Sequence, residues 1–109
     1  MPTLTQPDNC HIALPLDEIG AFCHRWKIVR LELFGSATRG DLRDDSDLDF
    51  LYVPAGDAQW GWEFVKACDE LEKIVQRPVD LVSRISIERS QNRFRRDSIL
   101  STAQTIYEA

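Results

Sequence analysis

The feature that most constrains this chain is the segment LFGSATRGDLRDDSDLDFLYV, residues 33–53. One apolar run ends there at a Gly-Ser pair and another begins at Leu48, with five aspartates between the two runs and within the second. The alternation of apolar and polar residues before Gly35 and the apolar run after Asp47 both predict β-strands. The chain must therefore hold a dense group of carboxylates against the ends of two strands, which is costly unless other groups balance their charge.

Hydrophobic periodicity predicts further helices and strands around this segment. Leu16, Ile19 and Phe22 recur at the three-residue steps of a helix that Pro15 opens. Val29, Leu31 and Leu33 alternate with the charged Arg30 and Glu32, which predicts a strand with one polar face. The complete prediction has helices over residues 15–27, 64–75 and 92–101, and strands over residues 29–33, 48–53, 78–83 and 104–109, the last of them at an edge of the sheet.

Two aspartates at the start of the second strand predict a cation site. Asp47 and Asp49 are two residues apart, so in a strand their carboxylates point to the same side. Asp80 lies in the apolar run VDLV, where a single charge needs a partner, a metal or an exposed cleft. Three hard oxygen ligands favour Mg²⁺ or Mn²⁺.

Two familiar loops share part of this pattern, and both are excluded. A calcium-binding helix-loop-helix needs glycine where Phe50 stands and glutamate where Gly56 stands. Gly35 and Gly40 have the spacing of a phosphate-binding P-loop, but Asp41 and Leu42 occupy the places of its lysine and its serine or threonine.

The order that remains resembles a known family. A strand, a Gly-Ser turn, a loop of about ten residues, an Asp-x-Asp strand and a third Asp on a later strand are the motif of the polymerase-beta-type nucleotidyltransferases. The segment is most similar to the minimal nucleotidyltransferases, often written G-S-x-x-R-G, a spacer and S-D-x-D. The positions that match are Gly35, Ser36, Arg39, Gly40, Ser46, Asp47 and Asp49.

The resemblance extends along almost the whole chain, since RPVDLVS fits the strand that carries the third carboxylate and the final residues fit the family's usual ending. It implies an α+β class, with the polymerase-beta-type nucleotidyltransferase fold: a small mixed sheet flanked by helices. We expect residues 1–109 to form a single domain of this kind, because a chain this short supports only one core.

The resemblance also implies roles for individual residues. Asp47 and Asp49 would hold two Mg²⁺ ions, with Mn²⁺ as an alternative, and Asp80 would join them and accept the proton of the attacking hydroxyl. ATP would be the substrate, and its phosphates would bind the Ser36 hydroxyl and the backbone amides after Gly35. The residues expected to bind the nucleotide are Gly35, Ser36, Arg39 and Ser46.

Charge and composition limit the partners. A net charge of −5 disfavours direct binding of nucleic acid, whose nonspecific affinity comes from protein cations. No segment has the length and apolarity of a membrane span or a signal peptide, so we expect a cytoplasmic protein with reduced cysteines. The charge is uneven, because residues 41–57 hold six aspartates and one arginine whereas residues 84–96 hold five arginines and one glutamate.

Three functions are compatible with these features. The first is an antitoxin enzyme that transfers AMP to a hydroxyl, most plausibly of a tyrosine, on a HEPN-domain toxin, as the resemblance implies. The second is an antitoxin that neutralises such a partner by contact alone, although an intact set of Ser36, Asp47, Asp49 and Asp80 argues against it. The third is adenylylation of a small molecule, but relatives of that kind carry an additional helical domain, which we do not expect after Ala109.

Overall fold

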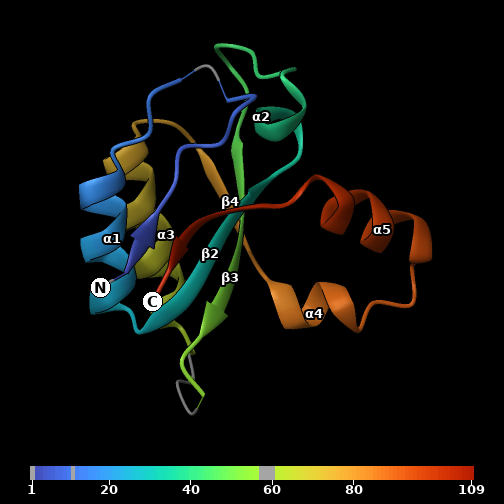
Figure 1. Ribbon diagram of the computed structural model, residues 1–109. Coiled ribbons are helices and arrows are strands. Elements are labelled where there is room, and N and C mark those ends of the chain that lie inside the picture. Colours follow the sequence, from blue (N-terminus) through green and yellow to red (C-terminus); the bar gives the residue numbers. More distant parts are fainter. Residues whose placement is uncertain (1, 11, 57–60) are drawn as a thin grey trace.

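The computed structural model describes residues 2–10, 12–56 and 61–109. Its centre is a five-stranded sheet in the order β1-β5-β2-β3-β4, with helices on both faces (Figure 1). The elements in chain order are β1 (Thr3–Leu4), α1 (Leu16–Arg25), β2 (Ile28–Phe34), α2 (Ser36–Arg39), β3 (Leu48–Pro54), α3 (Glu63–Val75), β4 (Val79–Ser83), α4 (Arg84–Glu88), α5 (Arg93–Thr102) and β5 (Gln104–Glu108).

The sheet is mixed, as the resemblance to the nucleotidyltransferases implies. β2 pairs with β3 in the antiparallel sense, whereas β3 and β4 run parallel. The parallel register places Asp49 directly beside Asp80, and the antiparallel register places Asp49 beside Phe34 on its other side. The two strands that carry predicted site carboxylates are therefore neighbours, and both carboxylates belong to the second residue of their strand.

The predicted position of the last strand is wrong. β5 does not lie at an edge but between β1 and β2, antiparallel to both. The edge is formed by β1, a strand of only two residues, Thr3–Leu4, that pairs with Tyr107 and Glu108. Such a short segment has no periodicity to identify it, so only the pairing shows that it belongs to the sheet.

One face of the sheet carries the main core under α1 and α3 (Figure 1). The apolar stripe of α1 buries Ile19 and Phe22, and α3 contributes Leu71. Phe50 of β3 points into the same core and is completely buried. The apolar residues that recur at helical spacing in α1 and α3 therefore pack against apolar residues of the strands, and burial of this apolar surface drives the packing.

The other face of the sheet is covered by α4 and α5, so the polar side chains that β2 places on that face are not all exposed to solvent. Phe34, Leu51, Ile87 and Ile99 form a second, smaller core there. Glu32, expected on a polar face, is only 3% exposed. Its carboxylate is paired with Arg84 at the start of α4, so the buried charge has a partner.

No helix in the described ranges is long and apolar enough to cross a membrane. The three cysteines of those ranges are free thiols, and burial raises the pKa of Cys23 to about 12.

Candidate active site

The candidate site begins where β2 ends, at the Gly-Ser turn. Gly35 has a φ of 77°, a conformation that favours glycine, and its carbonyl accepts hydrogen bonds from the amides of Thr38 and Arg39 at 3.1 and 3.2 Å. These bonds reverse the chain into the short helix α2. Ser36 is half-buried at the start of that helix, and its hydroxyl has no hydrogen-bond partner among the described residues.

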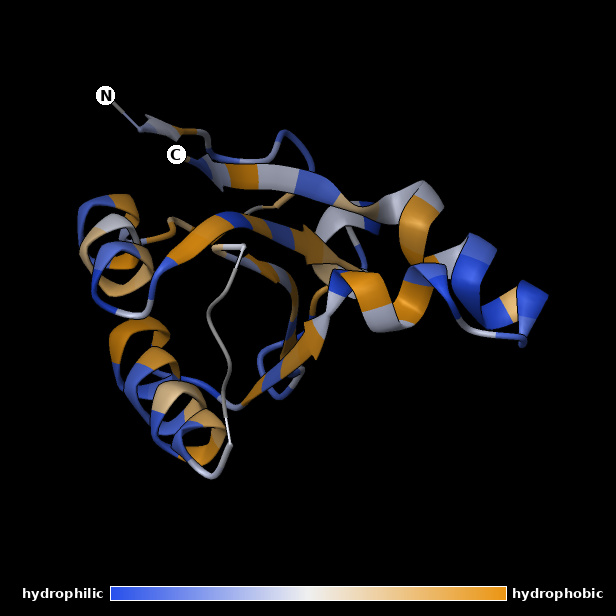
Figure 2. Ribbon diagram, turned by 90° about the horizontal axis from the view of Figure 1, so that it is seen from below, coloured by the Kyte–Doolittle hydropathy of each residue, from blue (hydrophilic) through white to orange (hydrophobic). Residues whose placement is uncertain are grey.

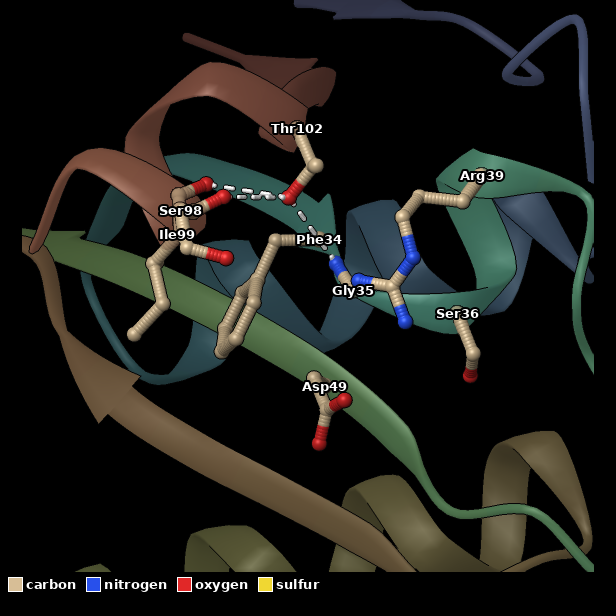
Figure 3. A pocket seen from close by; sticks show the side chains of 8 residues that line it. All are labelled: Phe34, Gly35, Ser36, Arg39, Asp49, Ser98, Ile99 and Thr102. Atoms are coloured by element: carbon tan, nitrogen blue, oxygen red, sulfur yellow. Dashed lines mark hydrogen bonds between the residues drawn. The ribbon is translucent and has the colours of Figure 1, made fainter. Parts of the chain in front are cut away.

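A pocket of about 280 Å³ opens beside this turn (Figure 3). It collects side chains from β2, α2, β3 and α5, so four elements that are separate in the sequence form its wall. Three predicted site residues with polar side chains are among them: Ser36, Arg39 and Asp49. The complete lining is Phe34, Gly35, Ser36, Arg39, Asp49, Ser98, Ile99 and Thr102.

Gly35 and Asp49 are in close contact across the β2–β3 pair. A Cβ atom added to Gly35 would lie 2.7 Å from Oδ2 of Asp49, well inside van der Waals contact. The positive φ requires glycine at this position, and any larger residue would in addition displace the end of the Asp49 side chain.

The environment of Asp49 opposes its ionisation. The pKa of this carboxyl rises from 3.8 to about 6, first because of burial and then because of the negative charges of Asp80 and Asp47, while the positive charge of Arg39 lowers it in part. The three predicted metal ligands are therefore close enough for the charges of Asp47 and Asp80 to raise the pKa of Asp49. A divalent cation would relieve this repulsion, and carboxylate oxygens are the ligands that Mg²⁺ prefers.

Asp47 and Asp80 lie at the margin of this arrangement rather than in the pocket. Both side chains are exposed, and neither lines the pocket with Asp49. Within residues 2–10, 12–56 and 61–109, no three His, Cys, Asp or Glu side chains form a ready-made cluster for a metal ion. The fold brings the strands of Asp49 and Asp80 together, but it does not preform a three-carboxylate site.

Ser46 shapes the loop that carries Asp47. Its hydroxyl accepts a hydrogen bond from the Arg43 amide at 2.9 Å, and its own amide donates to the Arg43 carbonyl at 3.1 Å. Arg77, which the sequence did not single out, donates from Nη1 to the carbonyls of Arg43 and Ser46 at 3.2 and 3.1 Å. The loop is therefore fixed at the point where the chain enters β3.

Thr102 is a second residue that the sequence analysis missed. Its hydroxyl accepts a hydrogen bond from the Gly35 amide at 3.2 Å and lies 3.2 and 3.1 Å from the carbonyls of Ser98 and Ile99 (Figure 3). The last turn of α5 is thereby joined to the Gly-Ser turn. The Gly35 amide is therefore paired within the protein, whereas the predicted phosphate contacts involve the Ser36 hydroxyl and the backbone amides that follow Gly35.

Arg39 projects from α2 on the exposed side of the pocket. Its guanidinium forms an ion pair with Asp41 at 3.2 Å, and both side chains are largely exposed, so this pair contributes little to stability. An anionic ligand in the pocket could therefore compete for Arg39 at small cost.

Comparison with known proteins identifies the family of the chain. The sequence model of the nucleotidyltransferase domain matches residues 19–106, which include the Gly-Ser turn, the Asp-x-Asp strand and β4. The chain belongs to the nucleotidyltransferase domain family. Comparison of this nucleotidyltransferase with curated proteins finds no significant match.

Solved structures give the same result for the fold. A protein described as a minimal nucleotidyltransferase is 30% identical, with 81% of this chain and 85% of the other covered and a TM-score of 0.63. This match confirms that the chain is a minimal nucleotidyltransferase with the predicted α+β fold.

Two more distant structures share the fold. A toxin-antitoxin with AMP-PNP is 18% identical, with 88% and 75% of the two chains covered and a TM-score of 0.68. A mutant of the toxin-antitoxin MntA-HpeT is 15% identical, with 85% and 72% covered and a TM-score of 0.63.

Proposed function

We propose that this nucleotidyltransferase transfers AMP from ATP to a hydroxyl, that of a tyrosine, on a HEPN-domain toxin, and that it acts as the antitoxin of that protein. The observation that carries the proposal is the pocket in which Asp49 faces the Gly35–Ser36 turn. Support for the biological setting comes from the structural relatives, two of which are described as toxin-antitoxin structures and one of these as a structure with AMP-PNP.

The donor set fits a divalent cation. Asp47, Asp49 and Asp80 would hold Mg²⁺, two ions in the proposal, with Mn²⁺ as an alternative. The fit rests on the chemistry of the donors and on the pairing of β3 with β4, which places Asp49 directly beside Asp80. Burial first, and then the charges of Asp80 and Asp47, raise the pKa of Asp49, and a cation would offset the part that comes from those charges. When bound, the metal supplies positive charge against the triphosphate and lowers the pKa of the acceptor hydroxyl.

The chain's own residues then bind and orient the substrates. Ser36 donates a hydrogen bond to a phosphate oxygen, and Arg39 exchanges Asp41 for the leaving pyrophosphate. The acceptor oxygen forms a bond to the α-phosphorus while the bond from that phosphorus to the β-phosphate oxygen breaks. Asp80 takes the proton of the acceptor hydroxyl.

A double substitution separates transfer from binding. Asp47→Asn with Asp49→Asn keeps the side-chain shapes and removes two charges, so the fold and partner binding should persist while AMP transfer falls by orders of magnitude. The assay incubates a HEPN-domain protein from the same genome with ATP, Mg²⁺ and each variant, and mass spectrometry measures the nucleotide gained. If the double variant still neutralises an unmodified toxin, the protein is a contact-only antitoxin and the proposal is wrong.

A further inference from the structure

The helices α4 and α5 and the residues between them form an arm that stands beside the sheet (Figure 1). We call residues 84–102 the α4–α5 arm. Its base is held by Ile87 and Ile99, which pack on Phe34 and Leu51 in the second core. The arm therefore has a fixed place on the domain.

The outer part of the arm carries arginines that the fold does not use. Arg84 is paired with Glu32 and Glu88, and Arg96 contacts Asp97 and the Ser90 carbonyl. The others are exposed and have no acidic partner among the described residues: Arg89, Arg93 and Arg95. Arg93 and Arg95 lie in the first turn of α5, and the ribbon in Figure 2 is mostly hydrophilic at that outer end of the helix.

An aromatic side chain lies among these free cations. Phe94 is 87% exposed, the largest exposed fraction of the big apolar side chains that the structure describes. Phe94 belongs to the first turn of α5, whose N-cap Asn92 accepts a hydrogen bond from the Arg95 amide at 3.1 Å. An exposed phenylalanine between two exposed arginines is typical of a protein-binding surface, because aromatic and arginine side chains are enriched at interfaces and contribute most of the binding free energy there.

The same helix leads directly to the candidate active site. Ser98, Ile99 and Thr102 of α5 line the pocket, and Thr102 binds the Gly35 amide. With a rise of 1.5 Å per residue, Arg95 and Thr102 are separated by about 10 Å along the helix axis. A molecule bound to the first turn of α5 would therefore reach the pocket within a few residues of its own chain.

We propose that the α4–α5 arm binds an acidic segment of the acceptor protein and presents that protein's hydroxyl to the pocket; this inference rests on the proposed function. Guanidinium groups bind carboxylates with paired hydrogen bonds, so free arginines select Asp- and Glu-rich partners. Phe94 adds an apolar contact at the centre of the surface. Exposed arginines on both sides of the exposed Phe94 complement a protein segment that offers carboxylates together with an apolar contact, which the sugar-phosphate backbone of a nucleic acid does not offer.

Binding of a defined acidic polymer tests this surface without requiring catalysis. The probe is a fluorescently labelled copolymer of glutamate and tyrosine, compared with a copolymer of lysine and tyrosine, and anisotropy gives the affinity in the absence of ATP. Arg93→Gln with Arg95→Gln should weaken binding of the acidic copolymer by at least about tenfold, and Phe94→Ser by about threefold. The lysine copolymer should bind the wild-type chain no better than it binds the double variant.

A matched control removes the same charge elsewhere. Lys66→Gln with Lys73→Gln lies on α3, which covers the opposite face of the sheet, and should leave the affinity within about twofold of wild type. Equal losses in the two double variants would overturn the proposal, because the effect would then be one of net charge. Arginine-dependent binding of single-stranded RNA in preference to the acidic copolymer would also overturn it, as would arginine-dependent self-association of the chain.

Transfer to the copolymer distinguishes this inference from the proposed function. With ATP and Mg²⁺ present, AMP on the tyrosines should fall in the arginine double variant while ATP affinity stays unchanged. Arginine-dependent binding with no transfer by the wild type would support the docking surface and count against the proposed chemistry. Transfer that is unaffected by Arg93→Gln with Arg95→Gln would leave the chemistry intact and overturn the docking surface.

Discussion

Replacing Asp49 with asparagine should stabilise the metal-free protein while it removes activity. The carboxyl has a pKa of about 6 in the fold, against 3.8 in its ordinary state. This rise in pKa would correspond to about 3 kcal/mol if the group were fully shielded from water. Asp49 is only half-buried, so solvent screening reduces the expected gain to about 1–2 kcal/mol.

The sign of this effect depends on pH. Because the folded pKa is raised, the protonated Asp49 contributes stability that is fully present below about pH 4 and is lost as the pH rises through about 6. Asparagine does not ionise, so the variant does not lose stability as the pH rises through this range. The variant should therefore exceed the wild type in stability at about pH 7.5, and the difference should vanish near pH 4.

Urea unfolding in EDTA at the two pH values measures this difference. Asp44→Asn, in the exposed part of the same loop, is the matched control and should change stability by less than about 0.5 kcal/mol. Added Mg²⁺ should stabilise the wild type and not Asp49→Asn. A variant no more stable than wild type at neutral pH would refute the claim that burial and the neighbouring carboxylates together oppose the ionisation of Asp49.

Two other substitutions test how the Gly-Ser turn is built. Gly35→Ala places a methyl group 2.7 Å from Oδ2 of Asp49 at a residue with a positive φ. The substitution should lower the free energy of unfolding by about 1–3 kcal/mol, measured by thermal unfolding, and should weaken ATP binding. Unchanged ATP affinity would contradict the role of this turn in binding the nucleotide. Thr102→Val removes the hydroxyl that accepts the hydrogen bond of the Gly35 amide, so it should lower the rate of AMP transfer and reduce the free energy of unfolding by about 1–2 kcal/mol. Thr102→Ser keeps the hydroxyl and should retain the wild-type rate. Equal rates for the two variants would show that Thr102 acts only by packing.

Local patterns in the sequence predicted the part of the site that local structure builds. The strand ending at Gly35 and the Asp-x-Asp strand follow from alternation and turn chemistry, and the structure pairs them with Phe34 beside Asp49. The predicted phosphate contact of Ser36 and the three-carboxylate metal site remain predictions.

Local patterns in the sequence did not predict the contacts between segments that are far apart along the chain. Thr102 meets Gly35 across 67 residues, and Arg77 meets Ser46 across 31. Glu32 was expected on a polar face because the alternation of β2 does not reveal that α4 covers that face. The place of β5 beside β1 likewise depends on strand pairing, which no local period encodes.

Two labelled forms of ATP show whether this minimal nucleotidyltransferase transfers a nucleoside monophosphate. A HEPN-domain protein is incubated with the chain, Mg²⁺ and ATP labelled either at the α-phosphorus or at the γ-phosphorus. Only the α-label should become bound to the protein, and the γ-label should leave as pyrophosphate. Incorporation of the γ-label, or of neither label while toxicity is still neutralised, would show that the protein does not act by transfer of AMP.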